Sequence, residues 1–295
     1  MNLPLVTIAV VTYNSSNFII ETLESVKKQT YKNIELIISD DHSSDNTVDL
    51  CRIWLSENKD VFTRTALIQS KENTGVAKNS SRALAETSGE WYKMLDGDDI
   101  LFPNCIEDFV NYVILHPSEN VISSYVKVYK DTFEYKNCIR DEHDYSTNFF
   151  ELDSYNQLLT LAKGNSIYSV SVIVRTNTLK RIGGFDSRFI FEDYPLLINL
   201  LEAGEKIYFM PIVTAGYRIH DSVSRSTTTI FNYRYKKIMR DFYKVKCKKY
   251  LPLSLKIRNE LIWGLQNLFE KLSINTKRYL NLYSVCEKFI SKIFR

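Results

Sequence analysis

The chain has 295 residues, of which 44% are hydrophobic, and it contains 19 tyrosines and 16 phenylalanines. This composition is typical of a folded protein with a sizeable core and excludes long disordered stretches. The five cysteines are odd in number and widely spaced, without a CxxC pair. We therefore expect neither a disulfide framework nor a zinc site, and a reducing compartment is favoured.

The N-terminal stretch MNLPLVTIAVVTYN has neither the basic start nor the cleavage site of a signal peptide. No apolar run approaches the roughly 20 residues that span a bilayer. These observations predict a cytoplasmic protein.

The net charge of +3 hides an asymmetry between the two ends of the chain. Residues 231–295 hold 16 Lys and Arg against 4 Asp and Glu, a net charge of +12, which leaves −9 for the rest. Such a basic tail suits an anionic surface, either membrane lipid or nucleic acid. The acidic body and the lack of any matching motif argue against nucleic acid.

Short runs rich in Val and Ile alternate with helical patterns from the N-terminus onward. The predicted strands are 5–12, 34–39, 65–69 and 91–95, and a helical stripe of apolar residues follows each of them. This alternation predicts a mostly parallel, open and twisted α/β sheet, Rossmann-like, with helices on both faces. Ligands of such sheets bind at the carboxyl ends of the strands.

Further strands are expected at 121–129, 169–175 and 206–210. A helix is predicted over 194–203, with Pro195 in its first turn and Gly204 at its C-terminus. The polar stretch 130–148 has no clear period and reads as an irregular excursion. Beyond residue 225 the pattern is helical, which divides the chain into a catalytic domain, 1–225, and a basic helical extension, 226–295.

The stretch EWYKMLDGDDIL, residues 90–101, places three carboxylates directly after a buried strand. Asp96, Asp98 and Asp99 would repel one another unless a cation or strong donors hold them, so the stretch favours a divalent metal. A solvated turn rich in Asp and Gly is the alternative.

Several motifs together resemble the inverting, GT-A-fold glycosyltransferases of family 2, over roughly the first 225 residues. The matching pieces are VVTYN (10–14), SVKKQTYKNIELIISDDHSSDNT (25–47), ENTGVAKNSSRALAETSGEW (72–91), LDGDD (95–99), GGFD (183–186) and ED (192–193). The combination is far more specific than any one of these motifs.

The resemblance implies a nucleotide-sugar site at the carboxyl edge of the sheet. Tyr13 would stack on the base, and Asp41 would accept a hydrogen bond from uracil N3–H. The loop 73–78 would lie near the nucleotide, with Asn73 in it and Lys78 beside the diphosphate. Asp96 would bind the ribose.

The resemblance also implies the groups that perform the chemistry. Asp98, with Asp99, would bind Mn²⁺ or Mg²⁺, and His220 matches a histidine that some members place near the metal. Asp193 would be the catalytic base, and Glu192 would orient the acceptor. A carboxylate base that activates the acceptor hydroxyl in a single displacement inverts the anomeric centre and needs no enzymic nucleophile.

Two positions depart from the family pattern: His42 stands where many members have Gly, and Lys78 where Arg is usual. The second exchange keeps the charge but loses the bidentate guanidinium. The QxxRW motif of processive synthases is absent from the sequence, which favours transfer of a single sugar.

The function implied is transfer of one hexose from a nucleotide sugar to a saccharide acceptor in surface polysaccharide synthesis, such as O-antigen or capsule assembly. The favoured donors are UDP-glucose, UDP-galactose and their N-acetylhexosamine forms, and a polyprenyl diphosphate would carry the acceptor. The alternative is a GT-A domain that binds nucleotide or saccharide without turnover. A nucleotidyltransferase is disfavoured because no Gly-rich phosphate loop follows the first strand.

The basic tail leaves two hypotheses open. Apolar and basic residues interleave over 233–246, so a helix there could attach to the anionic inner face of the plasma membrane. Alternatively, the tail is a helical bundle with a solvated basic face.

Overall fold

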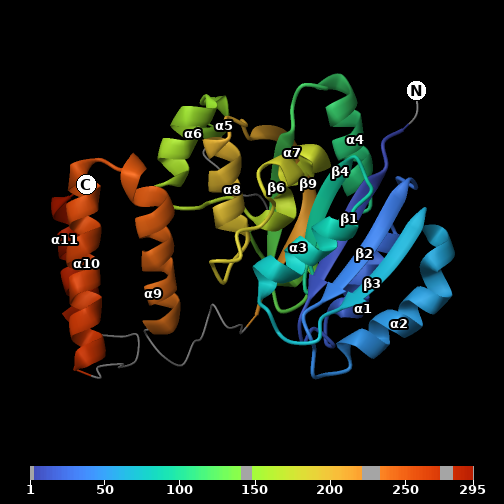
Figure 1. Ribbon diagram of the computed structural model, residues 1–295, viewed down its shortest axis with the longest axis horizontal. Helices are drawn as coiled ribbons and strands as arrows, with labels where there is room; N and C mark the ends of the chain where they lie inside the picture. Colours follow the sequence, from blue (N-terminus) through green and yellow to red (C-terminus); the bar gives the residue numbers. More distant parts are fainter. Residues whose placement is uncertain (1–2, 141–147, 221–232, 273–281, 295) are drawn as a thin grey trace. The chain divides into compact units, whose positions relative to one another are not determined.

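The computed structural model describes residues 3–140, 148–220, 233–272 and 282–294. Within them the strands form a nine-stranded sheet, of which eight lie in the order β3-β2-β1-β4-β8-β6-β9-β5 and β7 pairs with β6 (Figure 1). The chain divides into two compact units, Met1–Gln157 with Ser166–Ile219 and Leu158–Asn165 with His220–Arg295. The boundary predicted after residue 225 lies outside the described residues.

The amino-terminal half of the sheet is parallel, as the alternation of patterns predicts. Its strands are β1 (Val6–Thr12), β2 (Ile34–Asp40), β3 (Arg64–Gln69) and β4 (Trp91–Asp96). The intervening helices are α1 (Ile19–Lys27), α2 (Thr47–Asn58) with the short turn η1 (Lys59–Val61), and α3 (Val76–Glu86). Because the strands are parallel and adjacent, the loops that leave β2, β1 and β4 emerge at one edge.

The carboxyl-terminal half of the sheet mixes directions. Its elements are β5 (Ile100–Leu101), α4 (Cys105–Leu115), β6 (Val121–Lys130), η2 (Tyr135–Asn137), β7 (Cys138–Arg140), α5 (Asn148–Glu151), α6 (Ser154–Leu161), η3 (Ser169–Ser171), β8 (Ile173–Arg175), α7 (Thr176–Arg181), α8 (Asp193–Glu202) and β9 (Tyr208–Ile219). Strand β8 is antiparallel to both β4 and β6, whereas β6 and β9 are parallel. The sheet is therefore mostly parallel and flanked by helices, as expected.

Three predictions for this half need correction. The stretch 130–148 is not wholly irregular, because it contains β7, which pairs antiparallel with β6. The strand expected over 169–175 is a 3₁₀ turn followed by β8, and the last strand runs on to Ile219. Strand pairing between distant segments decides these boundaries, and local patterns carry little information on it.

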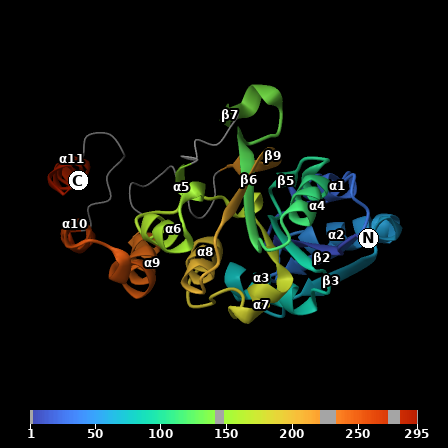
Figure 2. The ribbon, with the colours of Figure 1, turned by 90° about the horizontal axis from the view of Figure 1, so that it is seen from above.

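Helices cover both faces of the sheet (Figure 2). On one face, Val6, Ile8 and Val10 of β1 share a core cluster with residues of α1, α2 and α4. On the other face, α3 packs on β1 and β2. The alternation along β1 sends successive side chains to the two faces, and since both are covered the strand is apolar throughout.

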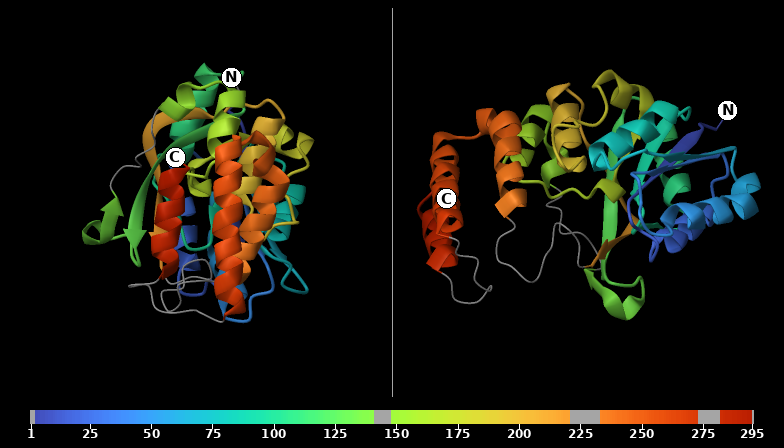
Figure 3. Two further views of the ribbon diagram at one scale, coloured as in Figure 1. Left: turned by 90° about the vertical axis from the view of Figure 1, so that its left-hand side faces the viewer. Right: turned by 60° about the horizontal axis from the view of Figure 1, so that its bottom comes forward.

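The second unit contains α9 (Tyr233–Phe242), η4 (Tyr243–Cys247), η5 (Lys248–Tyr250), α10 (Leu253–Lys271) and α11 (Leu282–Ile293). Helices α10 and α11 lie side by side (Figure 3). The helical nature of the extension is thus as predicted. Among the described residues, no helix has the length and apolar character needed to cross a bilayer.

Candidate active site

Hydrogen bonds tie the loops after β1, β2 and β4 together at the carboxyl edge. The Asn14 amide donates to Ser43 Oγ at 2.8 Å, and the Gly97 amide donates to the Val11 carbonyl at 2.9 Å. A Cβ on Gly97 would lie 2.9 Å from Thr12 Oγ1, so only glycine fits there without a shift. The ring of Tyr13 is 48% exposed beside this junction. The edge therefore has a fixed backbone and an accessible aromatic surface.

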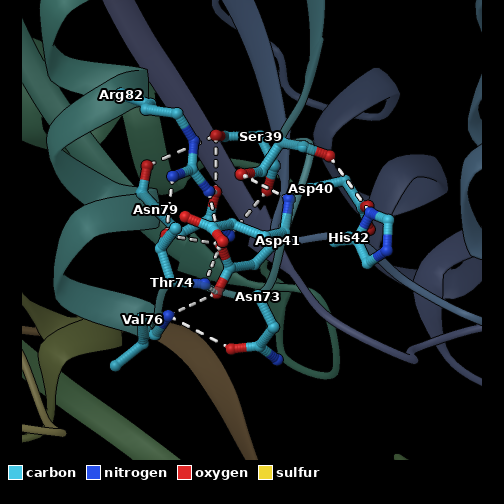
Figure 4. A network of polar contacts seen from close by, with 12 residues as sticks. Ser39, Asp40, Asp41, His42, Asn73, Thr74, Val76, Asn79 and Arg82 are labelled. Carbon is cyan, nitrogen blue, oxygen red and sulfur yellow. Dashed lines mark hydrogen bonds and ion pairs between the residues drawn. The ribbon is translucent and has the colours of Figure 1, made fainter.

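Asp41 orders the loop that leads into α3 (Figure 4). Its carboxylate accepts hydrogen bonds from the Gly75 amide at 2.6 Å, from Thr74 Oγ1 at 2.8 Å and from Arg82 Nη2 at 2.5 Å. Burial would raise the pKa of Asp41, but these donors outweigh it and hold the pKa below its ordinary value. Asp41 is therefore an ionised anchor for the loop 73–75.

His42 occupies a left-handed backbone conformation, with φ at 67°. This region costs an L residue with a Cβ roughly 1 kcal/mol and costs glycine almost nothing. The conformation explains physically why a glycine at this position is common in the family that the sequence resembles.

Asn73 and Lys78 lie on either side of the point where the loop 73–75 enters α3. Asn73 Oδ1 accepts a hydrogen bond from the Gly75 amide at 3.2 Å. Lys78 is exposed in the first turn of α3. Both side chains are thus accessible to a ligand at the edge.

The acidic loop 96–99 is compact. The Asp99 amide donates to the Asp96 carbonyl at 3.1 Å, and the Asp99 carbonyl accepts from Thr22 Oγ1 at 2.8 Å. Asp96 and Asp98 are partly exposed, whereas Asp99 is 1% exposed. Asp96 and Asp98 thus keep partial solvent exposure as residues, whereas Asp99 is buried.

Arg218, on β9, holds the acidic loop from the inside. Its amide donates to Asp99 Oδ1 at 2.8 Å, and its Nε donates to the Asp98 carbonyl at 2.7 Å. The guanidinium also donates to Glu21 at 2.5 Å and to the Asp131 carbonyl. It is 4% exposed, so these charge-assisted contacts are largely desolvated.

Aromatic rings complete the surroundings of Arg218. Its guanidinium carbon lies 4.1 Å from the ring centroid of Phe133 and 4.7 Å from that of Phe18. Cation–π contacts of this kind stabilise a buried guanidinium.

Glu192 and Asp193 begin α8, at its N-cap and first helical positions. Asp193 accepts a hydrogen bond from the Tyr194 amide at 2.7 Å. Burial, followed by the negative charges of Asp96 and Asp193, raises the pKa of Glu192 well above its ordinary value. Burial, Asp98 and Asp193 raise the pKa of Asp96 to about 7. The acidic loop and the start of α8 therefore form one electrostatically coupled cluster.

An apolar pocket adjoins this cluster. Asp193 lines it together with Tyr92, Met94, Ser169, Val172, Val174, Leu179, Phe185, Leu196 and Leu197. The Tyr92 hydroxyl is buried and has no hydrogen-bond partner within the described residues. Burial, then the charges of Glu192 and Asp96, raise the pKa of Tyr92 far above its ordinary value, so it stays neutral.

Among the described residues, no three His, Cys, Asp or Glu side chains are grouped closely enough to hold a metal ion. His220 follows β9 directly, is half-buried and belongs to the second unit. The trio Asp98, Asp99 and His220 stays a prediction.

Three residues of the candidate site, Arg218, Arg82 and Tyr92, could be assigned no role from the sequence. Arg218 interrupts an otherwise apolar strand end, Tyr217 to Ile219, and a lone charge at such a position is the signal that could have revealed it. Arg82 and Tyr92 offer no comparable signal, because an Arg on a helix and a Tyr in a strand are ordinary there.

Comparisons with known proteins agree with this arrangement. Residues 7–175 match the model of the family described as Glycosyl transferase family 2. The putative glycosyltransferase EpsE of Bacillus subtilis is 26% identical over 78% of this chain and 78% of its own. An Escherichia coli protein, the UDP-Glc:alpha-D-GlcNAc-diphosphoundecaprenol beta-1,3-glucosyltransferase WfaP, is 28% identical over 73% of this chain and 78% of its own.

Two solved structures share the fold. S. aureus TarS, in complex with UDP-GlcNAc, superposes with a TM-score of 0.61 at 19% identity, covering 82% of this chain and 66% of that one. The mannosyltransferase PcManGT of Pyrobaculum calidifontis, in complex with GDP-Man and Mn²⁺, has a TM-score of 0.55 at 20% identity, covering 84% and 64%. The family match spans more than half of the chain. The chain therefore belongs to glycosyl transferase family 2 and has the GT-A fold.

Proposed function

We propose that this chain is a non-processive, inverting enzyme that transfers one hexose from a UDP-sugar to a lipid-linked saccharide acceptor in bacterial surface polysaccharide synthesis. The observation that carries the proposal is that Asp193, at the start of α8, lines one pocket with Tyr92 and Met94 of β4, the strand that ends at the acidic loop. The name of WfaP, a glucosyltransferase that acts on a diphosphoundecaprenol acceptor, supports the donor and acceptor classes. The UDP-GlcNAc complex of TarS supports a UDP-sugar.

The nucleotide would bind along the carboxyl edge. The exposed ring of Tyr13 offers a stacking surface, and the accessible Asn73 and Lys78 suit a ribose and a diphosphate. Asp41 already accepts several hydrogen bonds from the loop 73–75 and from Arg82. We expect uracil N3–H to replace one of these donors, with the carboxylate staying ionised.

The residues of the acidic loop suit a hard divalent cation. Carboxylate oxygens are the ligands that Mg²⁺ and Mn²⁺ prefer, and Asp99 Oδ2 is a buried oxygen that accepts no hydrogen bond from the described residues. Asp98, with Asp99, would hold the ion and Asp96 would bind the ribose, while a role for His220 beside the metal stays a prediction from the sequence. When bound, the cation would neutralise the charge of the leaving diphosphate.

Asp193 would take the proton from the acceptor hydroxyl. A base works best when its pKa lies near the operating pH, and burial raises the pKa of Asp193 in that direction. Glu192, at the N-cap position beside it, would hold the acceptor. The apolar wall of the adjoining pocket excludes water from the proton transfer.

Calorimetry with UDP, GDP and CMP, each with and without Mn²⁺, tests the donor site. We expect UDP to bind in a metal-dependent manner and Asp98→Asn to weaken that binding at least about tenfold, because the carboxylate charge is lost. The matched control Asp60→Asn removes an exposed carboxylate in η1 and should change nothing. If no nucleotide binds to the wild type, the proposal is wrong.

Turnover of UDP-hexoses with a lipid-diphosphate saccharide tests the chemistry. Asp193→Asn should retain UDP binding and lower kcat by roughly 10²- to 10⁴-fold, the usual contribution of a general base. Metal-dependent UDP binding without turnover of any donor would instead favour a domain that only binds.

A further inference from the structure

Helices α10 and α11 expose apolar side chains at helical spacing. On α10 these are Leu253, Ile257, Leu261 and Leu268, and Leu272 follows at its C-cap, with exposed fractions of 41 to 72%. On α11 they are Val285, Phe289 and Ile293, with exposed fractions of 59 to 65%. Single exposed apolar residues are ordinary, but two stripes on neighbouring helices mark an interaction surface.

Helix α10 packs within the second unit through residues outside its apolar stripe. The ring of Trp263 on α10 makes an edge contact with Tyr243 at 4.8 Å between centroids, and Phe269 is buried. Lys248 and Glu260 form an ion pair at 2.7 Å. These contacts of α10 leave its apolar stripe exposed.

The sequence predicts an anionic membrane surface over residues 231–295, with 233–246 as its amphipathic segment. In that segment Phe242 is 1% exposed, and of the side chains described there Val245 is the large apolar one that is largely exposed, at 54%. More of the described exposed apolar side chains of the tail lie on α10 and α11.

Basic residues flank the apolar stripe on α11. Its exposed residues are Val285, Lys288, Phe289, Lys292 and Ile293, so lysines stand beside apolar side chains in two successive turns. This combination is typical of helices that lie in the plane of a membrane interface, where lysine stems reach up to the headgroups. A symmetric dimer that pairs this surface with its own copy is disfavoured, because residues 231–295 carry a net charge of +12 and two such tails repel.

We propose that the surface made by the exposed residues of α10 and α11 binds an anionic lipid bilayer. Its apolar stripes would enter the interface, and Lys288 and Lys292 would contact lipid phosphates. The binding itself does not depend on the donor site, but its use, which is to bring the enzyme to a lipid-linked acceptor, rests on the proposed function.

Sedimentation with vesicles of phosphatidylglycerol mixed with phosphatidylcholine tests the proposal on the full chain. We expect binding at low salt that weakens at 1 M salt, where the Debye length is only about 3 Å, and binding at least about tenfold weaker to phosphatidylcholine alone. Lys288→Gln with Lys292→Gln should weaken binding roughly thirtyfold, about fivefold for each charge near the surface. Val285→Gln, Phe289→Gln and Ile293→Gln together should weaken it more than about tenfold while keeping a good helix former at each position.

Two matched controls alter equally exposed residues in the first unit. Leu3→Gln, Ile53→Gln and Leu115→Gln remove three exposed apolar side chains, and Lys28→Gln with Lys59→Gln removes two exposed charges. Both should bind vesicles as the wild type does, and circular dichroism should show equal helix content in all variants.

Several results would overturn the inference. One is that the wild type does not bind anionic vesicles at low salt. Another is that it binds but neither α11 variant weakens the binding. A third is that the chain is a dimer in analytical ultracentrifugation and the triple variant Val285→Gln, Phe289→Gln and Ile293→Gln is a monomer. Nucleotide calorimetry on the same proteins separates this inference from the proposed function. If the chain binds vesicles but no nucleotide, only the proposed function is contradicted. If it binds nucleotide but no vesicles, only the membrane-binding inference is contradicted.

Discussion

Arg218 is the residue that holds the acidic loop of the candidate site in place. It connects β9 to the acidic loop, to α1 through Glu21 and to the turn at Asp131. These contacts reach across 87 to 197 residues of sequence. A guanidinium can serve several acceptors at once because its donors form a rigid planar fork, which an ammonium lacks.

Replacing Arg218 should therefore cost more than replacing an exposed arginine. We expect Arg218→Met to lower the free energy of unfolding by about 2–3 kcal/mol, since it removes the charge-assisted hydrogen bonds that a buried guanidinium donates to the Asp98 and Asp131 carbonyls and to Glu21. Arg52→Met removes an ion pair with Asp49 in which the Arg52 side chain is 57% exposed and the Asp49 side chain 73% exposed. This variant should lower the free energy of unfolding by less than about 1 kcal/mol. Urea unfolding of both variants measures the difference, and equal costs would show that Arg218 does not hold the loop.

Asp193 leads to a prediction on pH. Burial raises its pKa above the ordinary carboxylate value, and as a base it acts only when deprotonated. The acidic limb of kcat/KM should therefore lie above pH 4, near which an unperturbed Asp titrates, with activity falling as pH decreases through the raised pKa. A pH profile of kcat/KM checks this, with UDP affinity measured at each pH to separate loss of binding. A profile that stays flat down to pH 4 would contradict it.

At the scale of elements, the buried carboxylate of Glu35 connects neighbouring strands near their amino-terminal ends, at the edge of the sheet opposite the candidate site. Glu35 on β2 is fully buried and accepts hydrogen bonds from Thr7 Oγ1 at 2.5 Å, from Arg64 Nη1 at 2.6 Å and from the Ser88 amide at 2.9 Å. Burial alone would raise its pKa, but bonds from Ser88, Thr7 and Arg64 outweigh burial and lower the pKa of Glu35 to about 2. It thus links β1, β2, β3 and the turn before β4.

Glu35→Gln should lower the free energy of unfolding by about 3 kcal/mol at neutral pH, because the amide nitrogen faces donors instead of accepting from them. Glu86→Gln, which alters the other partner of Arg64 at a side chain that is 51% exposed, should cost less than about 1 kcal/mol. Urea unfolding measures both.

The effect of Glu35 should also depend on pH. A carboxylate whose pKa is lowered in the folded state stabilises the fold above its unfolded pKa, near 4.5, and loses that contribution as pH falls toward 2. The stabilities of the wild type and Glu35→Gln should converge over this range. A constant difference would show that Glu35 is not ionised in the fold.

At the scale of the whole molecule, the chain combines an acidic catalytic unit with a basic helical one. The charge difference and the helical character of the tail could be predicted, since both are compositional and local. Which residues of the tail form its exposed apolar surface could not be predicted from the sequence. The sequence predicted a membrane surface within 231–295 and singled out 233–246, and burial shows that more of the described exposed apolar side chains lie on α10 and α11.

The sequence by itself determined the parallel half of the sheet, the position of the acidic loop at the end of β4 and the start of α8 at Glu192 and Asp193. These follow from short-range periodicity, turn residues and capping, which act within a few residues. Only the tertiary structure decided that β8 and β7 run antiparallel, that Asp41 anchors the loop 73–75 and that Arg218 holds the acidic loop. Those contacts join segments far apart in the chain, and burial and pairing between such segments leave no period in the local sequence.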